Sequence, residues 1–210
     1  MANRKRTKKH DAFSITKIPI FLSLVIIIVG FVVFVISLSG LSQTTGKPET
    51  HYEEDYTNTE FINKLVPVAK ELHQTYGILP SIILGQAILE SDWGKSELSA
   101  KYNNLFGIKS FSPNDDSVKL TTKEYKDGKW IEIQANFKVY ASWEDCMRDH
   151  TMLFVNGVDW DPYLYQGVLL ASDYKTAAKA LQASGYATDP TYANKVIEVI
   201  ETNQLYQYDQ

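Results

Sequence analysis

Apolar residues form one long uninterrupted run near the start of the chain. Residues 18–41 contain no charged side chain, and residues 1–17 before them carry six basic side chains and one acid. A helix of ~20 residues crosses the hydrocarbon layer, and basic residues stay on the cytoplasmic side. The pattern predicts a cytoplasmic tail over 1–17, a transmembrane helix over 18–41 and an extracellular linker over 42–58. The alternative is a cleavable signal peptide, which has a shorter apolar region and a small-x-small cleavage site.

Helical periodicity begins after the predicted linker. In residues 59–76 the apolar positions recur at spacings of three and four, which is typical of an amphipathic helix. This stripe comprises Ile62, Leu65, Val66, Ala69 and Leu72. Residues 80–90 open with Pro80 and are apolar on nearly all sides, as in a helix buried at the centre of a domain. The predicted core helix ends in Glu90.

The spacing of apolar residues changes to two in the middle of the chain. Residues 118–125 and 130–140 flank Asp127-Gly128, a favoured two-residue hairpin turn. In the second segment apolar and polar residues alternate, as in a strand with one buried face. The apolar face comprises Ile131, Ile133, Ala135, Phe137 and Val139. The pattern predicts a β-hairpin in which Glu124 pairs with Ile131.

Helical signals return after residue 140. Ser142 and Asp145 resemble a capping box in front of a predicted helix over 143–155. A further predicted helix over 174–183 is stopped by Gly185, because glycine readily adopts the left-handed conformation that ends helices.

The last predicted helix begins at Asp189. Aspartate is a favoured N-cap residue, and Pro190 would occupy the first helical position. Helices with one inserted hairpin make residues 59–210 a small α+β domain that is mainly α.

Charge is distributed unevenly along the chain. Residues 1–17 sum to 6 − 1 = +5, and the whole chain sums to −4, so the remaining residues sum to −9. Phosphate contact requires positive charge on the folded part, which argues against a nucleic-acid-binding protein. The chain also has no phosphate-binding glycine loop. We therefore expect neither a nucleic-acid partner nor a cofactor.

Two other chemistries involve the predicted helix at 143–155. Cys146 and His150 lie four residues apart on one helix face, which raises the possibility of a cysteine peptidase. Such a dyad normally draws its two residues from different elements, and a buried cysteine on a helix is commoner. A metal site would have to use Asp149, His150, Asp159 and Asp161. This set lacks a recognised ligand spacing, so we expect no metal.

Glu90 and Glu124 are the candidate catalytic residues. An acid that ends so apolar a helix is poorly solvated, and desolvation raises the pKa of a carboxyl group as proton donation near neutral pH requires. The alternative is a helix-end acid in water. In the predicted register, Glu124 shares the inward face of the hairpin, whereas a slip of one residue would place it in solvent. Two carboxylates across a cleft are the standard apparatus for hydrolysing a glycosidic bond.

Five segments together resemble the bacterial glucosaminidase domain, glycoside hydrolase family 73. Residues 86–96 (QAILESDWGKS) and 102–109 (YNNLFGIK) are similar to its signature. Residues 122–125 (TKEY) and 137–142 (FKVYAS) are similar to its hairpin lobe, and 185–193 (GYATDPTYA) to its closing motif. The resemblance runs from about Thr59 to Tyr206. It implies a lysozyme-like helical domain with an inserted β-hairpin lobe, preceded here by one transmembrane helix.

The resemblance also implies an activity and roles for individual residues. The activity is hydrolysis of the β-1,4 bond after N-acetylglucosamine within peptidoglycan strands, as in an autolysin. Glu90 would be the general acid, Glu124 the second carboxylate, and Tyr192 a site tyrosine near the reacting sugar. Sugar rings stack on aromatic faces and need polar partners for their hydroxyls. The candidate substrate-binding residues are Trp93, Asn104, Phe106, Tyr125 and Tyr186.

Two further interpretations are compatible with the sequence. A lytic transglycosylase of the same fold also uses one glutamate but leaves a 1,6-anhydro-muramic end. A non-catalytic module would bind glycan or another envelope protein. In each case the predicted location is a single-pass protein of the cell membrane whose domain faces the wall. Gly30 and residues 37–40 could pack a neighbouring membrane helix, so a membrane-protein partner is also possible.

Overall fold

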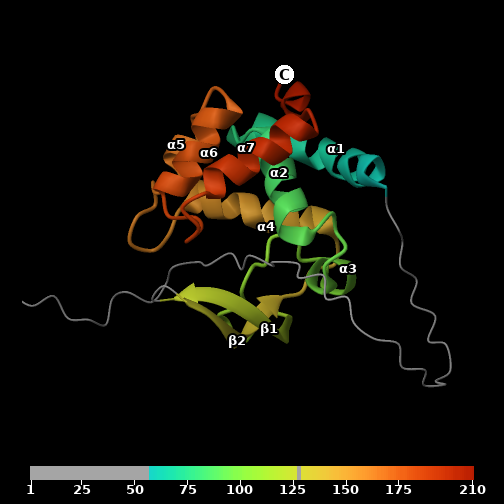
Figure 1. Ribbon diagram of the computed structural model, residues 1–210, viewed down its shortest axis with the longest axis vertical. Helices are drawn as coiled ribbons and strands as arrows, with labels where there is room; N and C mark the ends of the chain where they lie inside the picture. Colours follow the sequence, from blue (N-terminus) through green and yellow to red (C-terminus); the bar gives the residue numbers. More distant parts are fainter. Residues whose placement is uncertain (1–56, 127–128) are drawn as a thin grey trace, which may run out of the picture.

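The computed structural model describes residues 57–126 and 129–210, with side chains outside 123–130. The predicted cytoplasmic tail, transmembrane helix and most of the linker lie outside the described residues. Within the described residues, no helix is both long enough and apolar enough to cross a membrane. The prediction of a mainly helical α+β domain is confirmed, with a helical lobe standing above a two-stranded hairpin (Figure 1).

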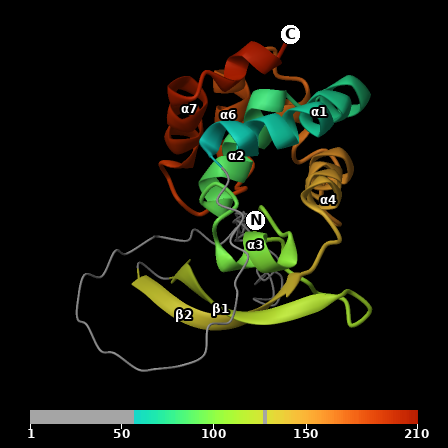
Figure 2. The same ribbon diagram turned by 90° about the vertical axis from the view of Figure 1, so that its right-hand side faces the viewer.

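Helix α2, Pro80–Ser91, is the centre of the helical lobe. It packs against α1 (Asn58–Tyr76), α6 (Tyr174–Ala183), α7 (Tyr192–Thr202) and the short 3₁₀ helix η2 (Leu205–Tyr208). Eleven of its twelve residues are buried, which confirms the prediction of a core helix. Figure 2 shows that its C-terminal end points toward the hairpin.

The start of α2 is capped by the far end of the chain. Leu79 at the N-cap has no side-chain acceptor. Instead, the Asp209 carboxylate accepts hydrogen bonds from the Ser81 backbone N–H at 2.8 Å and from the Ser81 hydroxyl at 2.7 Å. A carboxylate at this position satisfies an exposed N–H group and complements the positive end of the helix dipole. The C-terminus therefore helps to fix the helix that carries Glu90.

The hairpin consists of β1 (Ser117–Lys126) and β2 (Lys129–Lys138). Their antiparallel register pairs Glu124 with Ile131 and Leu120 with Ala135, so the predicted register is confirmed. The hairpin is joined to the helical lobe at its base, where the Lys138 N–H donates to the Ile108 carbonyl at 2.9 Å. Phe137, which is 4% exposed, anchors the hairpin from the same end.

The remaining helices agree with the sequence predictions in part. Helix α4 spans Trp143–Asn156, and Ser142 accepts from the Asp145 N–H as expected of its N-cap. Helix α6 has the predicted bounds. The short helices α3 (Glu97–Tyr102) and α5 (Gln166–Leu169) were not predicted, because each offers too few residues to show a period.

The predicted start of the last helix was wrong. Helix α7 begins at Tyr192, three residues after Asp189. The Asp189 carboxylate accepts from the Thr191 N–H at 2.8 Å and from the Thr191 hydroxyl at 2.7 Å. Asp189 thus forms a local turn in front of the helix instead of capping it. The shift makes Tyr192 the first residue of α7.

Candidate active site

A cleft of about 890 Å³ lies between the C-terminal end of α2 and the hairpin. Its helical wall comes from the end of α2 and the segment that leads into α3, and its other wall comes from β1 and β2. The lining residues are Ile88, Leu89, Glu90, Asp92, Trp93, Lys95, Ser96, Glu97, Leu98, Asn104, Gly107, Lys119, Leu120, Thr121, Thr122, Gln134, Phe137 and Val199. Glu90 is the acid that the buried helix contributes to this cleft.

A tight turn after Glu90 shapes the helical wall. Asp92, Trp93 and Gly94 have φ values of 51°, 61° and 77°, so three consecutive residues are left-handed. The Ser91 hydroxyl donates to the Ala87 carbonyl at 2.6 Å and accepts from the Gly94 N–H at 2.7 Å, which stabilises the turn. A Cβ at position 94 would lie 2.7 Å from the Trp143 ring, so the backbone packs directly against the core. The turn leaves Trp93 half-buried on the cleft wall.

Glu90 is almost entirely removed from solvent, with 7% of its surface exposed. Burial raises the pKa of its carboxyl group to about 8, while a hydrogen bond from Tyr192 and the charge of Lys195 act in the opposite direction. Desolvation dominates because the apolar surroundings cannot replace the water that stabilises a carboxylate. Glu90 is therefore mainly protonated at neutral pH, which is the state that a general acid requires.

Tyr192 is the hydrogen-bonding partner of Glu90. Its hydroxyl donates to Glu90 Oε1 at 2.8 Å and accepts from Gln86 Nε2 at 3.0 Å. Tyr192 is 1% exposed. The structure thus brings together two of the three predicted catalytic residues, although they lie 102 positions apart in the chain.

Glu124, the third predicted catalytic residue, lies on β1. The register places it opposite Ile131, at the same parity as Leu120 and Thr122. Both of these residues line the cleft. Tyr125 follows on the same strand and pairs with Trp130. The side chains of Glu124 and Tyr125 are outside the described part of the structure, so their predicted roles stay predictions.

The predicted substrate-binding residues lie in different environments. Trp93 and Asn104 line the cleft. The Asn104 amide, however, donates to the carbonyls of Ile108 and Lys138 at 2.9 and 2.8 Å, and its oxygen accepts from the Ile108 N–H. Asn104 is also only 1% exposed. It therefore holds the base of the hairpin against the helical lobe.

Phe106 and Tyr186 lie in the core, which corrects the expectation that they contact substrate. Phe106 is fully buried and stacks on the His150 ring with 3.7 Å between centroids. Tyr186 is 1% exposed, and its hydroxyl lies 2.7 Å from His150 Nε2. An aromatic residue in a site loop can face either the core or the cleft, and the sequence does not distinguish the two.

Sequence reasoning missed several polar groups of the site. Lys95, Lys119, Thr122 and Gln134 line the cleft, and Gln86 lies behind it. Gln86 could have been found from the sequence, because it lies four residues before Glu90 and thus on the same helix face.

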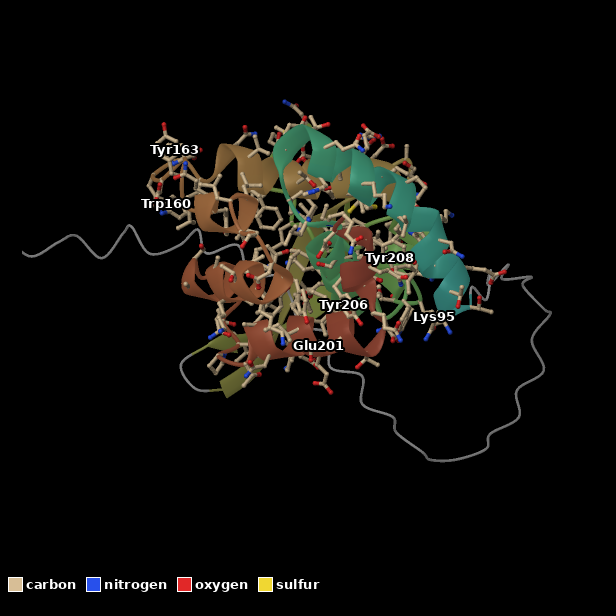
Figure 3. The ribbon with its side chains drawn as sticks, turned by 90° about the horizontal axis from the view of Figure 1, so that it is seen from above. Lys95, Trp160, Tyr163, Glu201, Tyr206 and Tyr208 are labelled. Carbon is tan, nitrogen blue, oxygen red and sulfur yellow. The ribbon has the colours of Figure 1, made fainter. Side chains whose placement is uncertain are left out.

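The exposed aromatic residues Trp160 and Tyr163 are remote from the cleft. Figure 3 shows them at the opposite end of the molecule from Lys95, which lines the cleft.

The cysteine–histidine and metal alternatives find no support in the structure. Cys146 is buried, its sulfur accepts from the Leu105 N–H at 3.3 Å, and burial raises the pKa of its thiol to about 12. Burial also lowers the pKa of His150 to about 3, and its Nε2 is paired with Tyr186. Among the described residues, no group of three or more His, Cys, Asp or Glu side chains could hold a metal ion.

Comparison with known proteins identifies relatives of this chain. A family profile described as "Glucosaminidase: Mannosyl-glycoprotein endo-beta-N-acetylglucosaminidase" matches residues 66–205. Exo-glucosaminidase LytG of Bacillus subtilis is 44% identical over 178 residues, which cover 83% of this chain and 63% of LytG. A probable N-acetylmuramidase of Lactococcus lactis is 37% identical, over 71% of this chain and 34% of its own length.

Solved structures agree with the sequence comparison. The catalytic domain of the autolysin Auto from Listeria monocytogenes superposes with a TM-score of 0.66 and 40% identity, covering 79% of this chain and 91% of that domain. This chain spans less than two thirds of the length of the two curated relatives above. The matched region includes the whole cleft between α2 and the hairpin. The chain belongs to the glucosaminidase family.

Proposed function

We propose that this chain hydrolyses the β-1,4 bond after N-acetylglucosamine in the glycan strands of peptidoglycan. The observation that carries the proposal is Glu90, a buried carboxylic acid whose pKa is raised to about 8 and which opens onto a large cleft. The names of the relatives support the substrate, since they include an exo-glucosaminidase, an autolysin and peptidoglycan hydrolases. The cleft has polar and aromatic groups on both walls, as a glycan requires.

In the proposed reaction, Glu90 gives its proton to the glycosidic oxygen as the bond from that oxygen to the anomeric carbon breaks. The leaving sugar keeps the proton as a hydroxyl group, and Glu90 becomes a carboxylate. A water oxygen then bonds to the anomeric carbon, and one proton of that water is taken up by a carboxylate, which leaves a reducing sugar end. We assign Glu124 as the second carboxylate, which acts on this water or on the positively charged sugar. Its position on β1 supports this role, because Leu120 and Thr122, which have the same parity, line the cleft and are half-buried. No cofactor or metal enters these steps.

The products of wall digestion test the function. Purified walls treated with the full chain are expected to release fragments with reducing N-acetylglucosamine ends, identified by mass spectrometry after borohydride reduction. Reducing N-acetylmuramic acid ends would indicate cleavage of the other bond, and 1,6-anhydro ends would indicate a lytic transglycosylase. Binding to walls without any release would favour a non-catalytic module. Each of these three results contradicts the proposal.

The lengths of the products distinguish two modes of cleavage. We propose internal cleavage, which releases fragments of mixed length from the start of the reaction. The Bacillus subtilis relative is named an exo-glucosaminidase, and cleavage from a strand end would release disaccharides alone. Sizing of the first products therefore decides between the two modes.

We further propose that residues 18–41 anchor the domain in the cell membrane, with the domain facing the wall. The uncharged run of 24 residues and the basic residues before it support this location. The full chain is expected in the membrane fraction and a variant that lacks residues 18–41 in the soluble fraction. Equal partition of both forms would contradict the anchor. A membrane-protein partner of this helix also remains a proposal.

A further inference from the structure

Two hydrogen bonds connect the interior of the domain to the proposed acid. Gln86 Nε2 donates to the Tyr192 hydroxyl oxygen at 3.0 Å, and the Tyr192 hydroxyl donates to Glu90 Oε1 at 2.8 Å. Gln86 is fully buried and is not part of the cleft wall. It lies one helical turn before Glu90 on α2, so one helix supports both ends of this chain of bonds.

The chemistry of the three groups determines the direction of these bonds. An amide NH₂ group can only donate, so the Tyr192 oxygen is the acceptor in its contact with Gln86. A phenolic hydroxyl has a single proton, and that proton is then directed to Glu90 Oε1. Because Oε1 already accepts this hydrogen bond, the acidic proton of Glu90 is placed on Oε2. The pair of bonds therefore selects the carboxyl oxygen that carries the transferable proton.

We propose that Gln86 is a positioning residue, which orients the Tyr192 hydroxyl so that Glu90 holds its reactive proton on Oε2. The inference rests on the proposed function and deepens it. Gln86 is not part of the cleft wall, so it acts on Glu90 through Tyr192. Its side chain also interacts with the Tyr186 hydroxyl, but that hydroxyl is paired with His150. The arrangement favours the transition state over the ground state, because the Tyr192 hydrogen bond strengthens as Glu90 becomes a carboxylate. Loss of the Gln86 hydrogen bond is therefore expected to lower kcat and to leave KM unchanged.

The other groups around Glu90 do not fulfil this role. The Tyr186 hydroxyl is paired with His150 at 2.7 Å, and the buried His150 is neutral at physiological pH because its pKa is lowered to about 3. Lys195 acts on Glu90 through its charge and is paired with Asp189 at 2.6 Å. On the solvent side, the ionisable residues of the cleft wall are Asp92, Lys95, Glu97 and Lys119.

A double-mutant cycle tests the inference. Gln86→Met keeps the length of the side chain but removes the donor, and it is expected to lower kcat about 10-fold with KM unchanged. Tyr192→Phe is expected to lower kcat about 10- to 100-fold. If Gln86 acts only through Tyr192, the double variant has the kcat of Tyr192→Phe alone. Multiplied effects, or an unchanged kcat in Gln86→Met, would overturn the inference.

Tyr165→Phe is the matched control. Tyr165 is also a buried aromatic residue, 3% exposed, and it contacts the Tyr186 ring. Among the described contacts, Tyr165 makes no hydrogen bond to Gln86, Tyr192 or Glu90. Removal of its hydroxyl group is therefore expected to leave kcat within twofold of the wild-type value. Unfolding midpoints of all the variants show whether each one is folded.

A measurement without substrate separates this inference from the proposed function. The Glu90 carboxyl resonance is followed by carbon NMR of the full chain as the pH is raised. The Tyr192 hydrogen bond lowers the pKa of Glu90, so Tyr192→Phe is expected to move the titration midpoint upward. Gln86→Met is expected to move it in the same direction, with no additional shift in the double variant. A midpoint that Gln86→Met leaves unchanged overturns the inference, even if the wild-type chain cleaves no wall.

Discussion

Replacement of Glu90 by Gln is expected to lower kcat for wall cleavage about 1000-fold, because general acid catalysis contributes roughly 10²–10⁴-fold. The amide has nearly the same shape as the protonated acid and can accept the hydrogen bond from Tyr192, but it has no proton to give to the glycosidic oxygen. The rate of reducing-end release from purified walls measures the effect. KM is expected to change little.

Glu198→Gln is the control for this substitution. Glu198 is an exposed acid on α7 and is not part of the cleft wall, so the same chemical change at that position is expected to leave kcat within twofold. Retention of more than a tenth of the wild-type kcat in Glu90→Gln would remove Glu90 from the mechanism.

The same substitution is expected to change the pH dependence of stability. The pKa of Glu90 is about 8 in the folded chain, against 4.5 for a solvated glutamic acid, so between these pH values the folded state holds more protons than the unfolded state. Its contribution to stability is therefore greatest at low pH and is lost as the pH rises through 8. The Gln side chain of Glu90→Gln does not titrate. The free energy of unfolding of the variant, relative to that of wild type, is therefore expected to rise by about 2–4 kcal/mol as the pH is raised from 5 to 8.

Urea unfolding of both proteins at pH 5 and pH 8 measures this gain. Above pH 5 the unfolded wild-type chain ionises this carboxyl group while the folded chain keeps it protonated, which lowers the free energy of unfolding, and the variant lacks this effect. Parallel pH dependences of the two proteins would show that Glu90 is solvated and ionises freely. An acid whose removal stabilises the fold is retained for its chemistry, so the stability measurement also bears on the proposed function.

Glu124→Gln is the second substitution with a large expected effect, a loss of about 100-fold in kcat. The amide cannot accept a proton from water or stabilise a positively charged sugar. The register places Glu124 at the parity of Leu120 and Thr122, which line the cleft and are half-buried, whereas Lys119 and Thr121 of the opposite parity are exposed, and the prediction rests on this placement. The initial rate of reducing-end release again provides the measurement.

Glu132→Gln is the matched control on the same hairpin. Glu132 pairs with Lys123, is exposed, and is not part of the cleft wall. Its replacement is expected to leave kcat within twofold. Equal losses in the two variants would indicate a general disturbance of the hairpin. An unchanged kcat in Glu124→Gln would mean that another group assists Glu90.

Local patterns in the sequence determined most of the secondary structure. An apolar segment bounded by Pro80 predicted α2, and alternation around the Asp127-Gly128 turn predicted the pairing of Glu124 with Ile131. These predictions succeeded because periodicity, capping and turn chemistry act between residues close in the chain. The start of α7 was predicted wrongly because the Asp189 carboxylate accepts a hydrogen bond from the Thr191 N–H, in a turn that precedes the helix, and does not cap the helix itself.

Some features of the site likewise follow from local sequence, and others follow from long-range contacts. The sequence by itself determined that Glu90 ends an apolar helix and that Glu124 lies on a hairpin strand. Only the tertiary structure decided that Glu90 is 7% exposed, that Tyr192 is its partner, and that Phe106 and Tyr186 face the core. Desolvation and hydrogen bonding depend on groups brought together from distant parts of the chain, and no local pattern specifies that contact.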